Sequence, residues 1–167
     1  MSKETKGKKD TEKKDSKQTS QSDTAEKKTY YEIKAENLTP EEREFLEKYA
    51  GKLSPTTLRA KWINDPNEHE DYPGQTLATQ NPEVIKRWAE ERQAVPATVP
   101  GTEHGDHLGV LTFDFPGYGG QKLEHVSWDE WLKTFKKRKL VFLFQEHMKN
   151  GRQSNFFHMD SPTREHD

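Results

Sequence analysis

The dipeptide Asn150-Gly151 constrains the fold of this chain more than any other short segment of the sequence. It separates an apolar run at 140–147 from a mixed run at 152–159 that contains Phe156, Phe157 and Met159. Asn-Gly is a strong short-range signal for a β-hairpin, because both residues tolerate a positive φ. The two runs are therefore predicted to be neighbouring antiparallel strands.

The hairpin also predicts which residues face each other. A two-residue turn centred on Asn150-Gly151 pairs residues whose numbers sum to 301, and successive pairs lie on opposite sides of the ladder. One side is apolar and the other is mixed, with the pairs Phe144–Phe157 and Phe142–Met159 on the first and Leu143–His158 and His147–Ser154 on the second. We expect the apolar side to face the core.

Two amphipathic helices are predicted before the hairpin. Asn81-Pro82-Glu83 supplies an N-cap, a proline for the first helical position and an acidic first turn, and this helix is expected to reach about Arg92. Ser127 and Glu130 form the capping-box pattern of the second helix. Its apolar stripe comprises Trp128, Trp131, Leu132 and Phe135.

Short strands are predicted between these helices, at residues 97–99 and 108–115. In the second strand Leu111, Phe113 and Phe115 alternate onto one face. The order α-β-β-α-β-β predicts an α+β fold, with a small antiparallel sheet and two helices packed on one side of it.

A helical hairpin is predicted ahead of this domain. Thr39 and Glu42 form a capping box for a helix at 40–50, and Ser54-Pro55 begins a shorter helix that runs to about Trp62. The segment has little apolar surface of its own, so we expect it to dock on the main domain or on a partner.

The remaining segments are polar. Hydrophobic residues make up 29% of the 167 residues and charged residues 34%, so part of the chain cannot bury enough surface to offset its conformational entropy. The predicted division is a disordered lysine-rich tail at 1–28, a helical hairpin segment at 29–63, a linker or loop at 64–80, the α+β domain at 81–160 and a disordered C-terminus at 161–167.

Composition excludes several functional classes. The chain has no cysteine, which rules out disulfides, thiolate nucleophiles and Cys-ligated zinc. We also expect no membrane-spanning segment, because no run approaches the roughly 18 apolar residues that one needs. The basic N-terminus has no apolar run behind it, so a secretory signal is not expected and a cytoplasmic location is predicted.

The most suggestive cluster of ligand-type side chains immediately precedes the second predicted strand. Two imidazoles and two carboxylates within five residues offer the nitrogen and oxygen donors that a divalent ion such as zinc accepts. The candidate metal ligands are Glu103, His104, Asp106 and His107, with His69 from the 64–80 loop. The alternative is a solvated polar loop. No cofactor is predicted beyond this metal hypothesis.

A basic run ends the second amphipathic helix and is a candidate surface for nucleic acid or another partner. It comprises Lys133, Lys136, Lys137, Arg138 and Lys139. Cations can contact phosphates, but the last turn of a helix also favours them through its dipole, by roughly 0.3–1 kcal/mol each. Together with the nine lysines of the tail, the run could form a weak nucleic-acid surface.

Residues 80–159 resemble a family of short bacterial proteins of unknown function. The resemblance lies in the stretches VIKRWAEER, PATVPGT, GVLTFDFPGYGG, LEHVSWDEWLKTF and LVFLFQEHMKNGRQSNFF. Members are sometimes labelled glucan branching enzymes. Such an enzyme needs a (β/α)₈ barrel of about 250 residues, so the resemblance carries over no catalytic domain and no catalytic carboxylates.

The sequence favours a non-catalytic module that binds another protein. No catalytic motif stands out, and the helical hairpin would add contact surface. The alternatives are a metal-binding protein or metal-dependent hydrolase that uses residues 103–107, and a weak nucleic-acid binder that uses the tail. Neither the oligomeric state nor the identity of the partner follows from the sequence.

Overall fold

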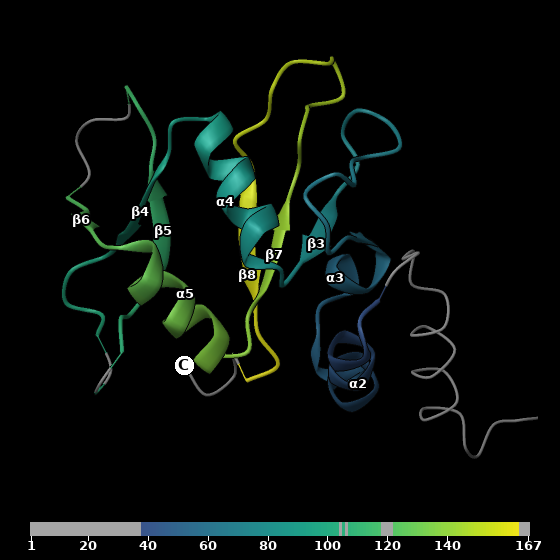
Figure 1. Cartoon of the computed structure of the whole chain (residues 1–167), viewed down its shortest axis with the longest axis horizontal. Coiled ribbons are helices and arrows are strands. Elements are labelled where there is room, and N and C mark those ends of the chain that lie inside the picture. Colours follow the sequence, from purple (N-terminus) through teal and green to yellow (C-terminus); the bar gives the residue numbers. More distant parts are fainter. Residues whose placement is uncertain (1–37, 104, 106, 118–121, 164–167) are drawn as a thin grey trace, which may run out of the picture.

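Figure 1 shows a computed structural model of the chain, which describes residues 38–103, 105, 107–117 and 122–163. The predicted tail, 1–28, lies outside the described residues, as do residues 164–167. Ser161 and Pro162 were predicted to belong to a disordered C-terminus, and this is wrong because both are buried. The Asp160 carboxylate accepts hydrogen bonds from the N–H groups of Ser161 and Ser54, which holds this end of the chain against the fold.

The described residues form an α+β fold. Its helices are α2 (Pro40–Tyr49), the short 3₁₀ helix η2 (Ala50–Lys52), α3 (Pro55–Arg59), α4 (Pro82–Glu91) and α5 (Trp128–Lys137). Its strands are β2 (Lys61–Trp62), β3 (Leu77–Thr79), β4 (Val95–Thr98), β5 (Leu111–Asp114), β6 (Glu124–His125), β7 (Val141–Phe144) and β8 (Phe157–Asp160).

The predicted helix starts are confirmed by their caps. Thr39 and Glu42 make both hydrogen bonds of a capping box at the start of α2. The side chain of Asn81 accepts the N–H groups of Glu83 and Val84, and the hydroxyl of Ser127 accepts the N–H of Glu130. Each cap satisfies donors that have no partner within the helix.

The helix after Ser54 is shorter than predicted. It ends at Arg59 because Ala60 turns extended, with a ψ of 159°. Trp62, predicted to end this helix, lies in β2 instead and is 1% exposed. Its indole N–H donates to the Thr57 carbonyl at 3.1 Å. Burial of the indole in the sheet therefore overrides continuation of the helix.

The segment 64–80, predicted as an irregular linker, ends in a strand. All three residues of β3, Leu77–Thr79, are buried, and β3 pairs in parallel with β2. Parallel neighbours need a crossover of about a dozen residues or more, and residues 63–76 supply it. The predicted boundary at residue 81 therefore does not interrupt the sheet.

The described strands form two sheets. The larger has the order β2-β3-β7-β8, in which β3–β7 and β7–β8 are antiparallel, and the smaller has the order β5-β4-β6. From Asn81 onward the observed order is α-β-β-β-α-β-β. It differs from the predicted α-β-β-α-β-β because the two-residue strand β6 pairs with β4. Figure 1 shows β8 and β7 between the smaller sheet and the α2–α3 pair.

The predicted register of the hairpin is confirmed over β7 and β8, where Val141–Asp160 through Phe144–Phe157 all sum to 301. The predicted turn is one residue too short. Met148 and Arg152 pair across a three-residue loop in which Gly151 has a φ of +90°. His147 therefore faces Gln153 instead of Ser154.

An extra residue restores the register beyond this turn. The N–H of Ser154 donates to the Glu146 carbonyl, whereas the N–H of Gln145 donates to the Phe156 carbonyl. One more residue therefore lies on the second strand than on the first between these two bonds. This is the arrangement of a β-bulge.

Both faces of the larger sheet are covered. One carries Phe142 and Phe144 against α4 in the main core cluster. On the other, Leu143 packs with Trp62 and with Leu46 of α2. Helices on only one side of the sheet were predicted, and this is wrong because the predicted helical hairpin docks on the opposite face.

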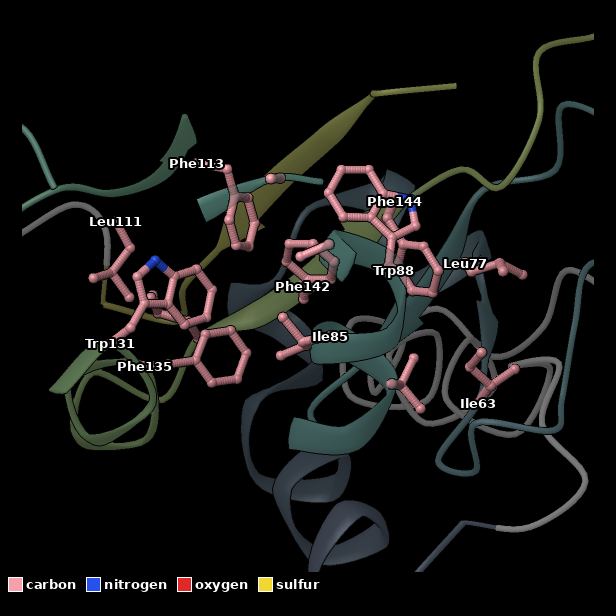
Figure 2. Close-up of a cluster of buried hydrophobic side chains, with 14 of the residues drawn as sticks. Ile63, Leu77, Ile85, Trp88, Leu111, Phe113, Trp131, Phe135, Phe142 and Phe144 are labelled. Carbon is pink, nitrogen blue, oxygen red and sulfur yellow. The ribbon is translucent and has the colours of Figure 1, made fainter. Parts of the chain in front are cut away.

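Trp88 of α4 lies at the centre of the main core. Its ring centroid lies 5.4–6.2 Å from the ring centroids of five phenylalanines, Phe113, Phe115, Phe142, Phe144 and Phe157. Figure 2 shows Trp88 beside Phe142 and Phe144, with Trp131 and Phe135 of α5 at the other end of the cluster. Aromatic burial thus joins α4, α5 and both sheets.

Among the described residues, no helix is both long and apolar enough to span a membrane.

Leu143→Ala tests whether the helical hairpin covers the second face. Leu143 is 1% exposed, so we expect this variant to lose about 2–5 kcal/mol of unfolding free energy through the cavity it creates. Its cross-strand partner His158 is exposed, so His158→Ala should change stability by less than about 0.5 kcal/mol. Urea unfolding followed by tryptophan fluorescence measures both. Equal effects of the two substitutions would contradict the packing.

Candidate functional site

A groove of about 590 Å³ lies where the N-terminal ends of α2 and α4 meet the C-terminal half of α5. Its apolar lining consists of Phe45, Pro82, Leu132, Phe135 and Leu140. Phe45 and Leu132 are only partly buried. The groove therefore presents apolar carbon to solvent at a seam between three helices.

Hydrogen bonds between loops fix the walls of this groove. The side chain of Asn64 donates to the Glu42 carboxylate at 3.1 Å, and the side chain of Asn81 donates to the Asn64 carbonyl at 2.9 Å. These two bonds join the N-terminal ends of α2 and α4. The side chain of Gln80, which follows β3, donates to the Leu140 carbonyl at 3.1 Å. This bond ties the segment after α5 to the end of β3.

The predicted basic surface lies partly on the rim of this groove. Lys133, Lys136 and Lys139 line it and are exposed, whereas Lys137 and Arg138 do not line it. Residues 133, 136 and 139 follow helical spacing, so three of the five basic side chains share one side of α5 and its end. Lys139 has a φ of +56°, which terminates the helix.

The opposite wall carries fewer free charges. Glu41 lines the groove and is exposed, whereas Glu42 is 6% exposed and accepts the capping N–H of Thr39 at 3.0 Å. Three exposed lysines thus face one exposed carboxylate. The resulting field favours acidic groups on the side of α5.

The predicted metal ligands are only partly described by the structure. His104 and Asp106 lie outside the described residues. Glu103 accepts the N–H of Gly101 at 3.1 Å, and the imidazole of His107 bonds to the Leu108 carbonyl at 2.7 Å. His69 is paired with Glu146 instead. Among the described residues, no group of three or more His, Asp or Glu side chains is arranged to hold a metal ion.

A second polar cluster lies around Glu146, where the crossover loop meets the end of β7. Glu146 is 8% exposed, and its carboxylate binds three groups. These are His69 Nδ1 at 2.9 Å, Arg87 Nη2 at 3.0 Å and the N–H of Glu70 at 2.9 Å. The buried carboxylate is thereby compensated, as a charge inside a protein must be.

A second His–Glu pair joins the same two segments, now with the histidine in the hairpin and the glutamate in the loop. His147 Nδ1 lies 2.5 Å from Glu70 Oε2. His69-Glu70 in the loop therefore pairs crosswise with Glu146-His147 in the hairpin. A small cavity of about 420 Å³ lies beside the cluster, lined by both histidines, Glu146 and Arg92. The two His–Glu pairs clamp the loop and the hairpin together.

Arg92 anchors the same region from α4. Its guanidinium donates to the carbonyls of Ser154 at 2.6 Å, Trp88 at 2.8 Å and Glu146 at 2.9 Å. It also lies 4.4 Å from the centroid of the Trp88 ring, a cation–π distance. Burial lowers the pKa of the Arg92 guanidinium, although Glu91 and Glu146 oppose this shift.

Sequence reasoning missed the partners in this cluster. Glu70 and Glu146 are 76 residues apart, and Arg87 and Glu146 are 59 apart. The pairing of β3 with β7 and the packing of α4 against the hairpin bring them together. The only local signal was His69 in the 64–80 loop, which we interpreted as a candidate metal ligand.

Comparison with known proteins adds no identification, since no family model, curated protein or solved structure matches the chain. The resemblance of residues 80–159 to short bacterial proteins therefore stays a prediction.

Arg92→Met tests whether this guanidinium holds the base of the hairpin. The variant keeps apolar length but removes a buried donor from three carbonyls, of which that of Glu146 keeps the N–H of Ser154. We expect a loss of about 3–5 kcal/mol in unfolding free energy. Arg92→Lys keeps the charge but lacks the planar fork, so its unfolding free energy should lie between those of the wild type and the methionine variant. Urea unfolding measures both, and hydrogen exchange at Ser154 and Phe156 reports local opening. Wild-type stability of the methionine variant would refute this role.

Proposed function

We propose that this chain is a protein-interaction module that holds a short segment of a partner protein in the groove between α2, α4 and α5. The observation that supports this most is an open apolar groove with three exposed lysines on one rim. The segment it fits carries apolar anchor residues with acidic residues beside them.

The lining favours a peptide segment over a small polar substrate. Phe45 and Leu132 offer partly exposed apolar surface, and the polar atoms of Asn64 and Asn81 already bond to one another or to Glu42. Binding energy would therefore come mainly from apolar burial, at about 25 cal/mol per Å². The lysines would add charge complementarity, which acts chiefly on specificity and association rate.

The same geometry argues against a phosphate-binding surface as the main role. Only three lysines line the groove, they flank an apolar floor, and Glu41 stands on the other wall. Nucleic-acid binding is dominated by contacts to phosphates and weakens steeply with salt. A groove of this composition should lose only modest affinity when salt is raised.

Charge reversal at Lys136 tests the groove. The probe is a synthetic helical peptide of about 12 residues, with leucines at i and i+4 and glutamates beside them. We expect Lys136→Glu to weaken its binding about tenfold, because a favourable charge pair becomes a repulsive one. Titrations followed by NMR give the dissociation constant and show whether the amides of Leu132 and Phe45 shift.

Lys137→Glu is the matched control. It makes the same charge change one residue away, at a side chain that does not line the groove, so binding should change less than about twofold. A second peptide, with lysines in place of the glutamates, should bind more weakly than the first. Shifts away from the groove, or equal effects of the two substitutions, would refute the proposed site. A steep loss of binding with salt would favour the nucleic-acid alternative.

A further inference from the structure

The outer edge of β8 in the larger sheet is self-complementary, because its outward N–H and C=O groups can pair with those of a second β8. β8 ends the order β2-β3-β7-β8, and among the described strands none pairs with its outer side. His158 is exposed, and Phe157 and Met159 are partly exposed. Open edges of this kind are templates for another strand.

The register shows which backbone groups point outward. The N–H of Gln145 donates to the Phe156 carbonyl at 3.3 Å, in the register that β7 and β8 share. Because hydrogen-bonded and non-hydrogen-bonded pairs alternate in an antiparallel ladder, Leu143–His158 is a hydrogen-bonded pair and Phe144–Phe157 is not. The N–H and C=O groups of Phe157 and Met159 therefore point away from β7.

We propose that β8 pairs with β8 of a second copy of this chain, antiparallel and about a two-fold axis at His158. Phe157 then faces Met159 of the other copy, and the reverse pair forms by symmetry. Both pairs exchange two backbone hydrogen bonds, so all four outward groups of each β8 are used. A shift by two residues in either direction leaves part of them without a partner.

The side chains also agree with this register. Phe157 and Met159 lie on the side of the sheet that faces the main core, where both pack against it. Pairing them across the axis places apolar beside apolar on that side, the kind of cross-strand contact that stabilises sheets. No lysine or proline lies within β8 to block the edge. Because this contact is isologous, it closes as a dimer.

Proline at position 159 tests this pairing in the full-length chain. Met159→Pro removes an outward N–H without removing any bond to β7, and Met159→Ala makes a comparable loss of side-chain packing while keeping that N–H. Sedimentation velocity over a range of concentrations gives the dimer dissociation constant. Relative to Met159→Ala, we expect the proline variant to raise it by at least about tenfold, because two of the four hydrogen bonds are lost.

A monomeric wild-type chain at concentrations up to about 1 mM, the range of weak complexes, would overturn the proposal. So would a proline variant that dimerises as well as the alanine variant. Circular dichroism checks that both variants fold. If the proline variant does not, hydrogen exchange of the wild-type chain decides. The Phe157 and Met159 amides should exchange more slowly as concentration rises, and no such change would reject the pairing.

Discussion

Trp88 is the side chain on which the packing of both sheets depends. Its indole contacts Phe113 and Phe115 on the side of the smaller sheet and Phe142, Phe144 and Phe157 in the larger one. An aromatic side chain of this kind buries roughly 150–250 Å². The indole N–H also donates to the Gln145 carbonyl at 2.8 Å, which fixes the orientation of the ring against the hairpin. None of the described strands pairs across the two sheets, so this contact network sets their relative position.

Arg92 extends this constraint from the core to the base of the hairpin. One helical turn after Trp88, its guanidinium stacks on the indole and donates to the carbonyls of Glu146 and Ser154. These two carbonyls flank the bulge, where the ladder between the strands is interrupted. The Glu146 carbonyl also accepts the N–H of Ser154, so the guanidinium is its second donor. A buried cation is costly unless its hydrogen bonds are satisfied, and the bulge supplies acceptors at that point. The bulge at 154–155 and Arg92 of α4 therefore stabilise each other, because the bulge supplies carbonyl acceptors and the guanidinium supplies donors.

Signals within short stretches of the sequence predicted the helix starts and the register of the hairpin. The caps at Thr39, Asn81 and Ser127 were predicted because each depends on residues within one helical turn. The β7–β8 register was predicted because a short turn between consecutive strands sets it. The strand at Leu77–Thr79 was missed because three residues show no period, and Trp62 left its expected helix for a partner more than ten residues away. The hydrogen bonds of Glu70 and Glu146 could not be predicted for the same reason, because they join segments that are distant in the sequence. Of the candidate groove, the sequence indicated the basic rim on α5 but not its apolar floor, which forms only when three distant helices meet.

The coverage of the sheet determines where this molecule can still bind. Helices α2 and α3 occupy one face of the larger sheet, and α4 and the aromatic core occupy the other. Among the described residues, the two faces of the larger sheet are therefore not open for binding, whereas seams between helices and strand edges are. The groove is such a seam. Its lysines also complement the dipole at the end of α5, so their number alone is no evidence for a partner. Their position is stronger evidence, because the helix dipole would be served equally by cations on any side of the last turn. Lys133, Lys136 and Lys139 all line the groove, together with the partly exposed Leu132.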